Sequence, residues 1–344
     1  MVTNSKKTEF SISTDMLIVL IILSAIAVYY YGIRALIITL ISSLTSVITD
    51  LICLKIQKRK SDWQDLSSLI TGLVLALMMS AGAPYFAVII AAAFSIIIGK
   101  HAFGGYGYAI FNCPAVGFLF ISLCFSEFMF SYPKPFEYLP NESLIPVGSL
   151  YPSMTKSILF TDTSIVSIID LVVGKFNGPM GTNYIIVLII SALFLVFRRS
   201  ISAISLFTQL GIVFLFTFFS KEMDLIHTIH ILSSGMLLFG IIFLSCDYST
   251  IPKTKSSRFI YGIITAVLTL IFQYYAKVEN AIVYAVIISA PLGIELDRRA
   301  LSFAKMFADK DNKLNQKQNS ISETVSLVNV GSEQNEIQSQ NGSH

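Results

Sequence analysis

The chain has 344 residues, of which 54% are hydrophobic and only 13% are charged, and its formal net charge is +3. A soluble domain could not hide so much apolar surface behind so few charges, whereas a lipid bilayer can solvate it. The composition therefore predicts an all-α membrane protein with no soluble catalytic domain, and it excludes a nucleic-acid-binding protein.

Long apolar segments follow one another along most of the chain. A helix that crosses a bilayer needs roughly 17–25 mostly apolar residues, and by this criterion we expect about ten transmembrane helices. The first segment ends in tyrosines rather than in the small residues of a cleavage site, which indicates a retained span. The expected spans are 15–31, 35–56, 66–81, 83–99 and 107–128, followed by 183–198, 203–220, 228–246, 258–275 and 279–296.

Lysine and arginine are concentrated in alternate connections between these spans. Such residues gather on the cytoplasmic side of a membrane. The short connections assigned to the outside contain few of them, namely Arg34, Lys221 and Lys277. The pattern therefore predicts a cytoplasmic N-terminus over 1–14 and a cytoplasmic tail over 301–344. The tail is rich in Asn, Gln, Ser, Glu and Lys, so most of it is expected to be disordered.

One connection on the predicted outer side is much longer than the others. Residues 129–182 include the prolines Pro133, Pro135, Pro140, Pro146 and Pro152. A connection of this length without regular structure is typical of a functional or disordered segment. We therefore expect an extracytoplasmic loop over 129–182.

The long loop separates two sets of five expected spans, 15–128 and 183–300. An odd number of spans in each half predicts two inverted five-helix repeats, a plan used by membrane proteins with a central site. Pro114 with Gly117, and Pro291 with Gly293, occupy corresponding spans. Proline breaks a helix and frees carbonyl groups, so matched breaks would indicate a cavity near the membrane midplane. The alternative is two ordinary proline kinks.

The four cysteines, Cys53, Cys113, Cys124 and Cys246, lie in or at the ends of apolar stretches. They show no CxxC spacing and have no nearby histidine pair, so we predict packing residues and no metal site.

Several motifs resemble one family of membrane proteins. Residues 100–107 read Lys-His-Ala-Phe-Gly-Gly-Tyr-Gly and are followed by Ile-Phe-Asn at 110–112. Residues 69–77, the segment 229–252 with Ile-His-Ile-Leu-Ser and Asp-Tyr-Ser-Thr-Ile-Pro, and residues 281–297 add further agreement in the same order. From about 15 to 300, the chain is similar to the D component of the Rnf electron-transport complex (the NqrB/RnfD family), as a divergent member.

The sequence also departs from the family pattern. The family's Asn-Pro-Ala is Asn112-Cys113-Pro114 here, and an acidic residue common before the sixth span is absent at 178–182. The family's flavin-attachment motif, Ser-Gly-Ala-Thr-Pro-Leu, is absent in that form. Its nearest counterpart is 152–157, where only Thr155 matches the attachment residue; Thr161 and Thr163 are weaker candidates.

The resemblance implies one component of an ion-translocating complex of the ferredoxin:NAD oxidoreductase type in a bacterial cytoplasmic membrane. Its partners would be the other membrane and peripheral subunits and a flavin transferase. The implied cofactor is FMN, with Thr155 as the candidate attachment residue, and a second flavin is an open expectation. The chain would not be a complete enzyme, and no catalytic residue is assigned.

The remaining candidate residues have a functional and an ordinary interpretation. Lys100, Gly104, Gly105, Gly107 and Asn112 could hold a flavin or quinone head because glycines permit close backbone approach, although a tight turn would use the same glycines.

The candidates for an ion pathway are Asp247, Glu295 and His230. Ionisable residues at membrane depth usually face a cavity. Solvated helix ends and a packing histidine are the simpler interpretations.

Two other classes of function stay open at this point. Inverted repeats also suit a channel or small-solute transporter, and the altered flavin motif is compatible with a flavin-free membrane anchor for a redox partner.

Overall fold

The computed structural model describes residues 2–59, 65–103, 110–161, 167–220, 224–233 and 235–302, apart from the side chains of 2–8, 159–161 and 168. The chain divides into two compact units, Met1–Ile294 and Glu295–His344. We call them the helical unit and the tail unit and describe each by itself.

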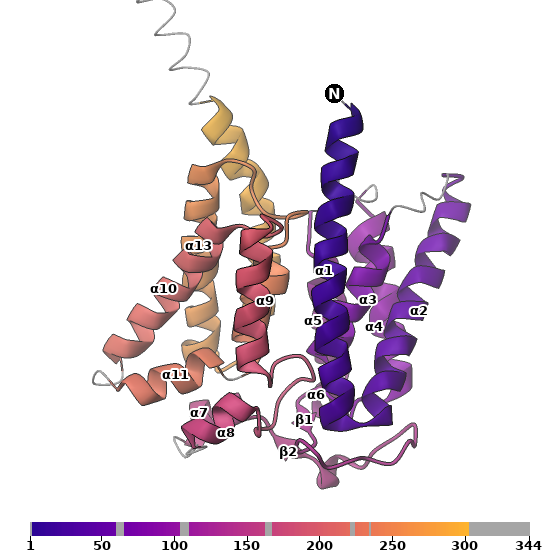
Figure 1. Cartoon of the computed structure of the whole chain (residues 1–344), viewed down its shortest axis with the longest axis vertical. Coiled ribbons are helices and arrows are strands. Elements are labelled where there is room, and N and C mark those ends of the chain that lie inside the picture. Colours follow the sequence, from indigo (N-terminus) through magenta and orange to yellow (C-terminus); the bar gives the residue numbers. More distant parts are fainter. Residues whose placement is uncertain are drawn as a thin grey trace, which may run out of the picture. The chain divides into compact units, whose positions relative to one another are not determined.

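The first half of the helical unit is a group of helices that pack side by side (Figure 1). The helix α1 is longer than the expected span and begins at Val2. The π-helix η1 continues α4 directly, and α5 begins six residues later than the expected limit at 107. The elements are α1 (Val2–Tyr31), α2 (Ile33–Ile56), α3 (Ser67–Met78), α4 (Tyr85–Phe94), η1 (Ser95–His101), α5 (Cys113–Cys124) and α6 (Ser126–Met129).

The long connection 129–182 contains regular elements, which its proline-rich sequence did not lead us to expect. Its two strands form an antiparallel pair in which Ser131 faces Pro152 and Tyr132 faces Tyr151. The connection lies at the end of the bundle opposite the start of α1 (Figure 1). Its elements are β1 (Ser131–Tyr132), η2 (Val147–Ser149), β2 (Tyr151–Pro152), α7 (Met154–Thr161) and α8 (Ile168–Val173).

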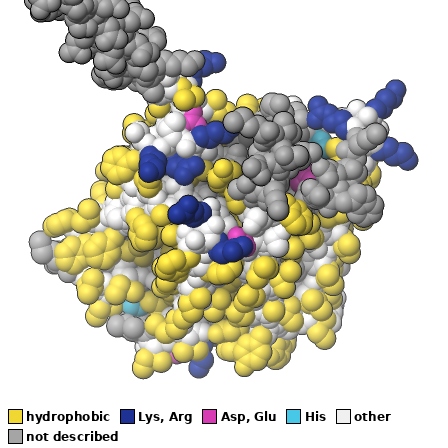
Figure 2. All heavy atoms as spheres, turned by 45° about the horizontal axis from the view of Figure 1, so that its top comes forward, with side chains coloured by type: hydrophobic (Ala, Val, Ile, Leu, Met, Phe, Trp, Pro, Cys, Tyr) yellow, Lys and Arg dark blue, Asp and Glu magenta, His cyan; other side chains and the backbone are white. Residues whose placement is uncertain are grey.

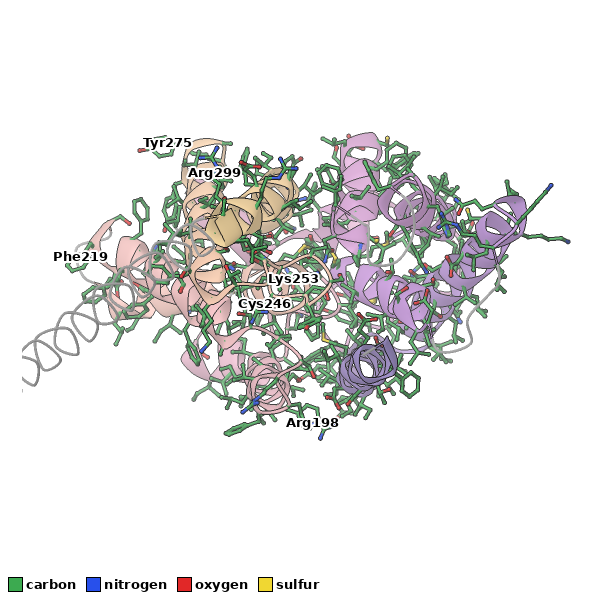
Figure 3. All side chains as sticks on the ribbon, turned by 90° about the horizontal axis from the view of Figure 1, so that it is seen from above. Arg198, Phe219, Cys246, Lys253, Tyr275 and Arg299 are labelled. Carbon is green, nitrogen blue, oxygen red and sulfur yellow. The ribbon has the colours of Figure 1, made fainter. Side chains whose placement is uncertain are left out.

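The second half forms another group of helices beside the first, as the view from above shows (Figure 3). Here Arg198, Phe219 and Tyr275 point outward, whereas Cys246 lies in the interior. The elements are α9 (Ile185–Phe197), α10 (Ala203–Ser220), α11 (Leu225–Ser233), α12 (Leu237–Gly240), η3 (Ile241–Ser245), α13 (Lys255–Leu270), η4 (Ile271–Tyr275) and a last helix over 281–302.

Several helices are long and apolar enough to cross a membrane. In the described part of the chain these are 9–31, α2, α10 and 255–275. The helix α11 and the following 237–245 meet the same criterion only when taken together, as a broken span or a re-entrant loop, and are bent by 58° at the break between them. Shorter apolar helices occupy α3, 85–101, α5 and α9. Many large apolar side chains on their outer faces are exposed, and Figure 2 shows them covering much of the surface. The chain is therefore a multi-pass helical membrane protein.

The predicted helix breaks at the two prolines are wrong. Pro114 lies in the first turn of α5. The N–H groups of a first turn have no partner within the helix, so a proline there costs no helical hydrogen bond. Pro291 lies inside the helix over 281–302, which continues past it. The observed interruption is the bend between α11 and α12, next to Gly235, whose φ of +63° favours glycine.

Ionic and polar contacts join the parts of the helical unit. Arg198 pairs with Asp15, its Nη2 lying 3.0 Å from Oδ1, and so connects the end of α9 to α1. Arg34, which is 1% exposed, donates to the carbonyls of Ala81 and Ala83 and to those of Pro140 and Glu142. One guanidinium therefore joins α2, the α3–α4 connection and the long connection.

Candidate functional site

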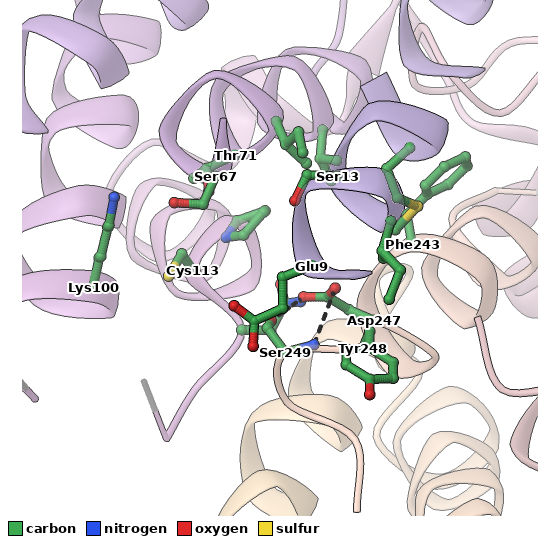
Figure 4. A pocket seen from close by; sticks show the side chains of 16 residues that line it. Glu9, Ser13, Ser67, Thr71, Lys100, Cys113, Phe243, Asp247, Tyr248 and Ser249 are labelled. Atoms are coloured by element: carbon green, nitrogen blue, oxygen red, sulfur yellow. Dashed lines mark hydrogen bonds between the residues drawn. The ribbon is translucent and has the colours of Figure 1, made fainter. Parts of the chain in front are cut away.

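A cavity opens between the two halves of the helical unit, at the end where α1 starts (Figure 4). Its volume is about 80 Å³, enough for several water molecules, since one needs roughly 10–15 Å³ by this measure. It combines polar groups with apolar walls, an arrangement typical of ligand sites. The lining residues are Glu9, Ile12, Ser13, Met16, Ser67, Ile70, Thr71, Val74, Lys100, Asn112, Cys113, Pro114, Phe243, Asp247, Tyr248 and Ser249.

Asn112 links the two halves at this cavity. Its Oδ1 accepts from the backbone N of Ala115 at 3.2 Å and so caps α5. Its Nδ2 donates to the carbonyl of Leu244 at 3.3 Å and lies 3.5 Å from the Oδ2 of Asp247. The side chain is 1% exposed. It therefore fixes the start of α5 against the end of η3, which belongs to the other half.

Asp247 follows η3 and carries the carboxylate of this cavity wall. Its Oδ2 accepts from the hydroxyl of Ser249 at 2.5 Å. Burial raises the pKa of the Asp247 carboxyl, and the hydrogen bonds from Ser249 oppose that effect. A carboxyl in such surroundings can exchange a proton or neutralise a cation.

Lys100 belongs to a buried ionic cluster behind the cavity wall. Its Nζ lies 3.0 Å from Oδ2 of Asp50, 2.9 Å from Oδ2 of Asp65 and 2.9 Å from Oγ of Ser68. The Nε2 of His101 lies 2.6 Å from the other oxygen of Asp50. Since an ammonium group has three protons to donate, all three are used. Lys100 thus holds α2, α3 and η1 together and has no proton left for a ligand.

The structure brings together Lys100, Asn112 and Asp247 from the predicted set. The glycines Gly104, Gly105 and Gly107 lie outside the described residues. His230 is 5% exposed and its Nδ1 lies 2.7 Å from the carbonyl of Ile226, one turn earlier on α11; it does not line this cavity.

Glu295 belongs to the tail unit. Within that unit it pairs with Arg299 at 2.9 Å and with Arg298 at 3.6 Å on an exposed helix face. Such surface pairs contribute little to stability, and a role in ion movement stays a prediction.

Thr155, the candidate attachment residue, is buried. Its side chain is 3% exposed, and a Cβ added to Gly235 would collide with its Oγ1. The adjoining cavity measures about 10 Å³, room for about one water molecule. These residues do not fit a covalently attached flavin in this conformation, because α7 would first have to move away from Gly235. The inner cavity of about 80 Å³ is likewise too small for a flavin ring system as it stands.

Several residues of the site were missed from sequence. Ser67 and Thr71 lie one turn apart on α3 and face the cavity, and Ser13 faces it from α1. Asp50 anchors the ionic cluster. Their common signal is a polar residue inside an apolar span, which is costly in lipid and usually faces the protein interior. That signal was used for Asp247 and His230 but not for these residues.

Fold and site together define a multi-pass helical membrane protein with a polar cavity and a buried ionic cluster where its two halves meet. The chain belongs to the NQR2, RnfD, RnfE family, whose model matches residues 2–297.

Relatives cover most of the chain at low identity. The D subunit of a Na⁺-translocating ferredoxin:NAD⁺ oxidoreductase complex from Acetobacterium woodii is 25% identical over 83% of this chain and 86% of the relative. The D subunit of an ion-translocating oxidoreductase complex from Actinobacillus succinogenes is 24% identical over 77% and 84%. The D subunit of a proton-translocating ferredoxin:NAD⁺ oxidoreductase complex from Clostridium ljungdahlii is 24% identical over 76% and 81%.

Proposed function

We propose that this chain is the D-type membrane component of an ion-translocating electron-transport complex of the ferredoxin:NAD⁺ oxidoreductase kind. The observation that carries the proposal is the family match over 2–297, together with relatives named as D subunits that cover most of their own length. Its partners are the other membrane and peripheral subunits of that complex.

The inner cavity is the place where this chain would act in such a complex. Asn112 holds the two halves in register, and Asp247 presents a partly desolvated carboxylate to the cavity. An ionisable group between two halves of a membrane protein can bind a cation or proton in one state and release it in another. The protein contributes position and charge.

Replacing Asp247 with asparagine tests this role. We expect Asp247→Asn to lower the electron-transfer rate of the assembled complex about tenfold, since a hydrogen bond to a charged group contributes about 1.5–3 kcal/mol. The measurement is ferredoxin-dependent reduction of NAD⁺ by inverted membrane vesicles, with ion uptake followed in parallel.

The matched control is Asp170→Asn. Asp170 also accepts from a serine hydroxyl, that of Ser167 at 2.8 Å, but it lies on α8 away from the cavity. The control should keep the wild-type rate. Equal rates in Asp247→Asn and wild-type vesicles would count against the role of the cavity, and an intact rate in vesicles lacking the whole chain would refute the proposed function.

The membrane topology belongs to the same proposal. We propose about ten spans in two inverted repeats, following the length criterion, with both termini in the cytoplasm of a bacterium. The basic residues of alternate connections support this orientation. The long connection 129–182 and α7 then face outward. Cleavage of that connection by a protease added outside spheroplasts tests the orientation.

FMN on Thr155 also remains a proposal. The resemblance to the attachment motif and the proposed outward position of α7 support it, whereas the burial of Thr155 favours the second candidate, a flavin-free membrane component. Covalent attachment by a transferase requires α7 to swing away from Gly235.

In-gel flavin fluorescence separates the two candidates. The chain is produced together with a flavin transferase and denatured before electrophoresis. If Thr155 carries FMN, the wild-type band fluoresces and the Thr155→Val band is dark, with Thr182→Val, another buried threonine of the connection, as the fluorescent control. A dark wild-type band would exclude covalent FMN and leave the flavin-free component.

A further inference from the structure

A second group of buried polar side chains lies at the opposite end of the helical unit. It surrounds a small cavity lined by Thr155, Leu237, Thr269, Gln273, Glu279, Ala281 and Ile282. The cavity volume is about 10 Å³, so it has room for a single particle of about the size of one water molecule. It lies between α7, α12, the end of α13 with η4, and the start of the last helix.

Several polar atoms here have no hydrogen-bond partner among the described residues. They are the Oε1 of Gln273 and both side-chain amide atoms of Asn280. The carboxylate of Glu279 beside them is approached by the hydroxyls of Tyr132 and Ser153 and by Lys156. Gln273 is 3% exposed and Asn280 is 1% exposed. Buried polar atoms are nearly always hydrogen-bonded, so a cluster that lacks partners indicates a bound particle or water. The Oε1 of Gln273 belongs to a residue that lines the cavity.

The local backbone supports a functional interpretation of this cluster. Gln273 lies in the π-helix η4, and such turns often occur at functional sites. Thr155 is held beside the bend of the α11–α12 segment by its contact with Gly235. The cluster therefore lies where two irregular helices meet, and such places can change shape with little loss of helical hydrogen bonding.

Glu279 is the only acidic residue among those that line this cavity. The groups that act on its carboxyl are Tyr132 of β1, Ser153 just before α7, and Lys156 of α7. Burial raises the pKa of Glu279 to about 7, and the two hydroxyls and Lys156 moderate that rise. One acid cannot balance a divalent ion, and no group of three His, Cys, Asp or Glu in the described part of the chain could hold a metal ion. Oxygen atoms with a single negative charge suit a hard monovalent cation.

We infer that Glu279, with Gln273 and Thr155, forms a binding site for one monovalent cation, either a sodium ion or a proton, in the outer half of the second repeat. The cation would neutralise the carboxylate and satisfy the oxygen atoms that lack partners. As a station for a transported ion, the site rests on the proposed function. Binding itself needs only this chain.

The test uses the purified full-length chain in detergent and follows thermal unfolding with a dye that reacts with newly exposed cysteines, such as the buried Cys246. Sodium chloride is exchanged for choline chloride at constant ionic strength and at pH 8.5. If sodium binds, the Tm of the wild type rises with sodium concentration and that of Glu279→Gln does not. Glu137→Gln, which changes an exposed glutamate of the long connection, should respond as the wild type does.

The second arm varies pH without sodium. A carboxyl whose pKa is raised on folding stabilises the folded state fully below its unfolded pKa of about 4.5, and this stabilisation is lost as the pH rises through about 7. If the site takes only a proton, the wild-type Tm falls over this range, Glu279→Gln lacks that fall, and sodium has no effect. Identical responses of wild type and Glu279→Gln in both arms would overturn the inference.

Gln273→Leu keeps the test decisive if Glu279→Gln does not fold. It removes a neutral oxygen and leaves the charge, so we expect about tenfold weaker apparent affinity for sodium, the effect of losing one bond to a charged group, or a displaced pH response in the proton case. An unchanged response would contradict the site. If the assembled complex shows no activity while the isolated chain still binds sodium, the result counts against the proposed function and not against the binding site.

Discussion

Replacing Lys100 with methionine is expected to destabilise the protein by about 3–5 kcal/mol, the usual cost of removing one partner from a buried ion pair. Methionine keeps much of the length of the side chain but leaves Asp50 and Asp65 without the ammonium group that lies 3.0 and 2.9 Å away. The side chain of Asp50 is only 10% exposed, so water cannot replace the lost partner. The measurement is the midpoint of unfolding in detergent.

The control for this prediction is Lys55→Met, which removes a lysine from the exposed end of α2. It should change the midpoint little, because an isolated surface charge contributes less than about 1 kcal/mol. The double variant Lys100→Met with Asp50→Asn should recover part of the loss, since it also removes one of the two carboxylates that Lys100 neutralised. A Lys100→Met midpoint equal to that of Lys55→Met would show that the cluster does not hold α2, α3 and η1 together.

Replacing Arg34 with methionine is expected to release the first part of the long connection and to destabilise the protein by several kcal/mol. The guanidinium donates to the carbonyls of Ala81, Ala83, Pro140 and Glu142. Ala81 and Ala83 are buried, and each buried carbonyl that loses its donor costs about 1–3 kcal/mol. Limited proteolysis of spheroplasts should therefore cut the segment 133–146 faster in Arg34→Met than in the wild type.

Lys175→Met provides the comparison, because Lys175 is an exposed cation on the same connection. Its cleavage rate should equal that of the wild type. Arg34→Lys should fall between the two, since an ammonium has three donors and lacks the planar fork that reaches two parts of the chain. Cleavage that occurs only after the cells are broken would place the connection on the cytoplasmic side and contradict the proposed topology.

The elements could be predicted well from sequence because the lipid requirement leaves a strong and local signal. A helix overlaps each of the expected spans, but among the described residues only four helices, or five with the bent pair, are long and apolar enough to cross a membrane. The boundaries that differ have local causes. Pro114 begins α5 rather than interrupting it, because proline fits the first turn of a helix. Gly235, which has no side chain to clash at positive φ, marks the bend that the proline pattern did not locate.

The candidate site was predictable only in part. Asn112 and Asp247 stood out through their motifs, and they do lie together at the cavity. Lys100 was expected to contact a cofactor, yet its three protons go to Asp50, Asp65 and Ser68. Nothing local to Lys100 indicates these partners, because Asp50 and Asp65 are 50 and 35 residues away in the chain.

Hydropathy and motifs were enough to establish a membrane protein of successive apolar helices and its family, because both signals are carried by neighbouring residues. The identity of the polar groups that meet could be learned only from the folded chain: Asn112 with Leu244, Arg34 with Glu142, and Glu279 with Gln273 around one small cavity. A buried polar group must find its partner across the fold, and the packing of distant helices, not the local pattern, chooses that partner.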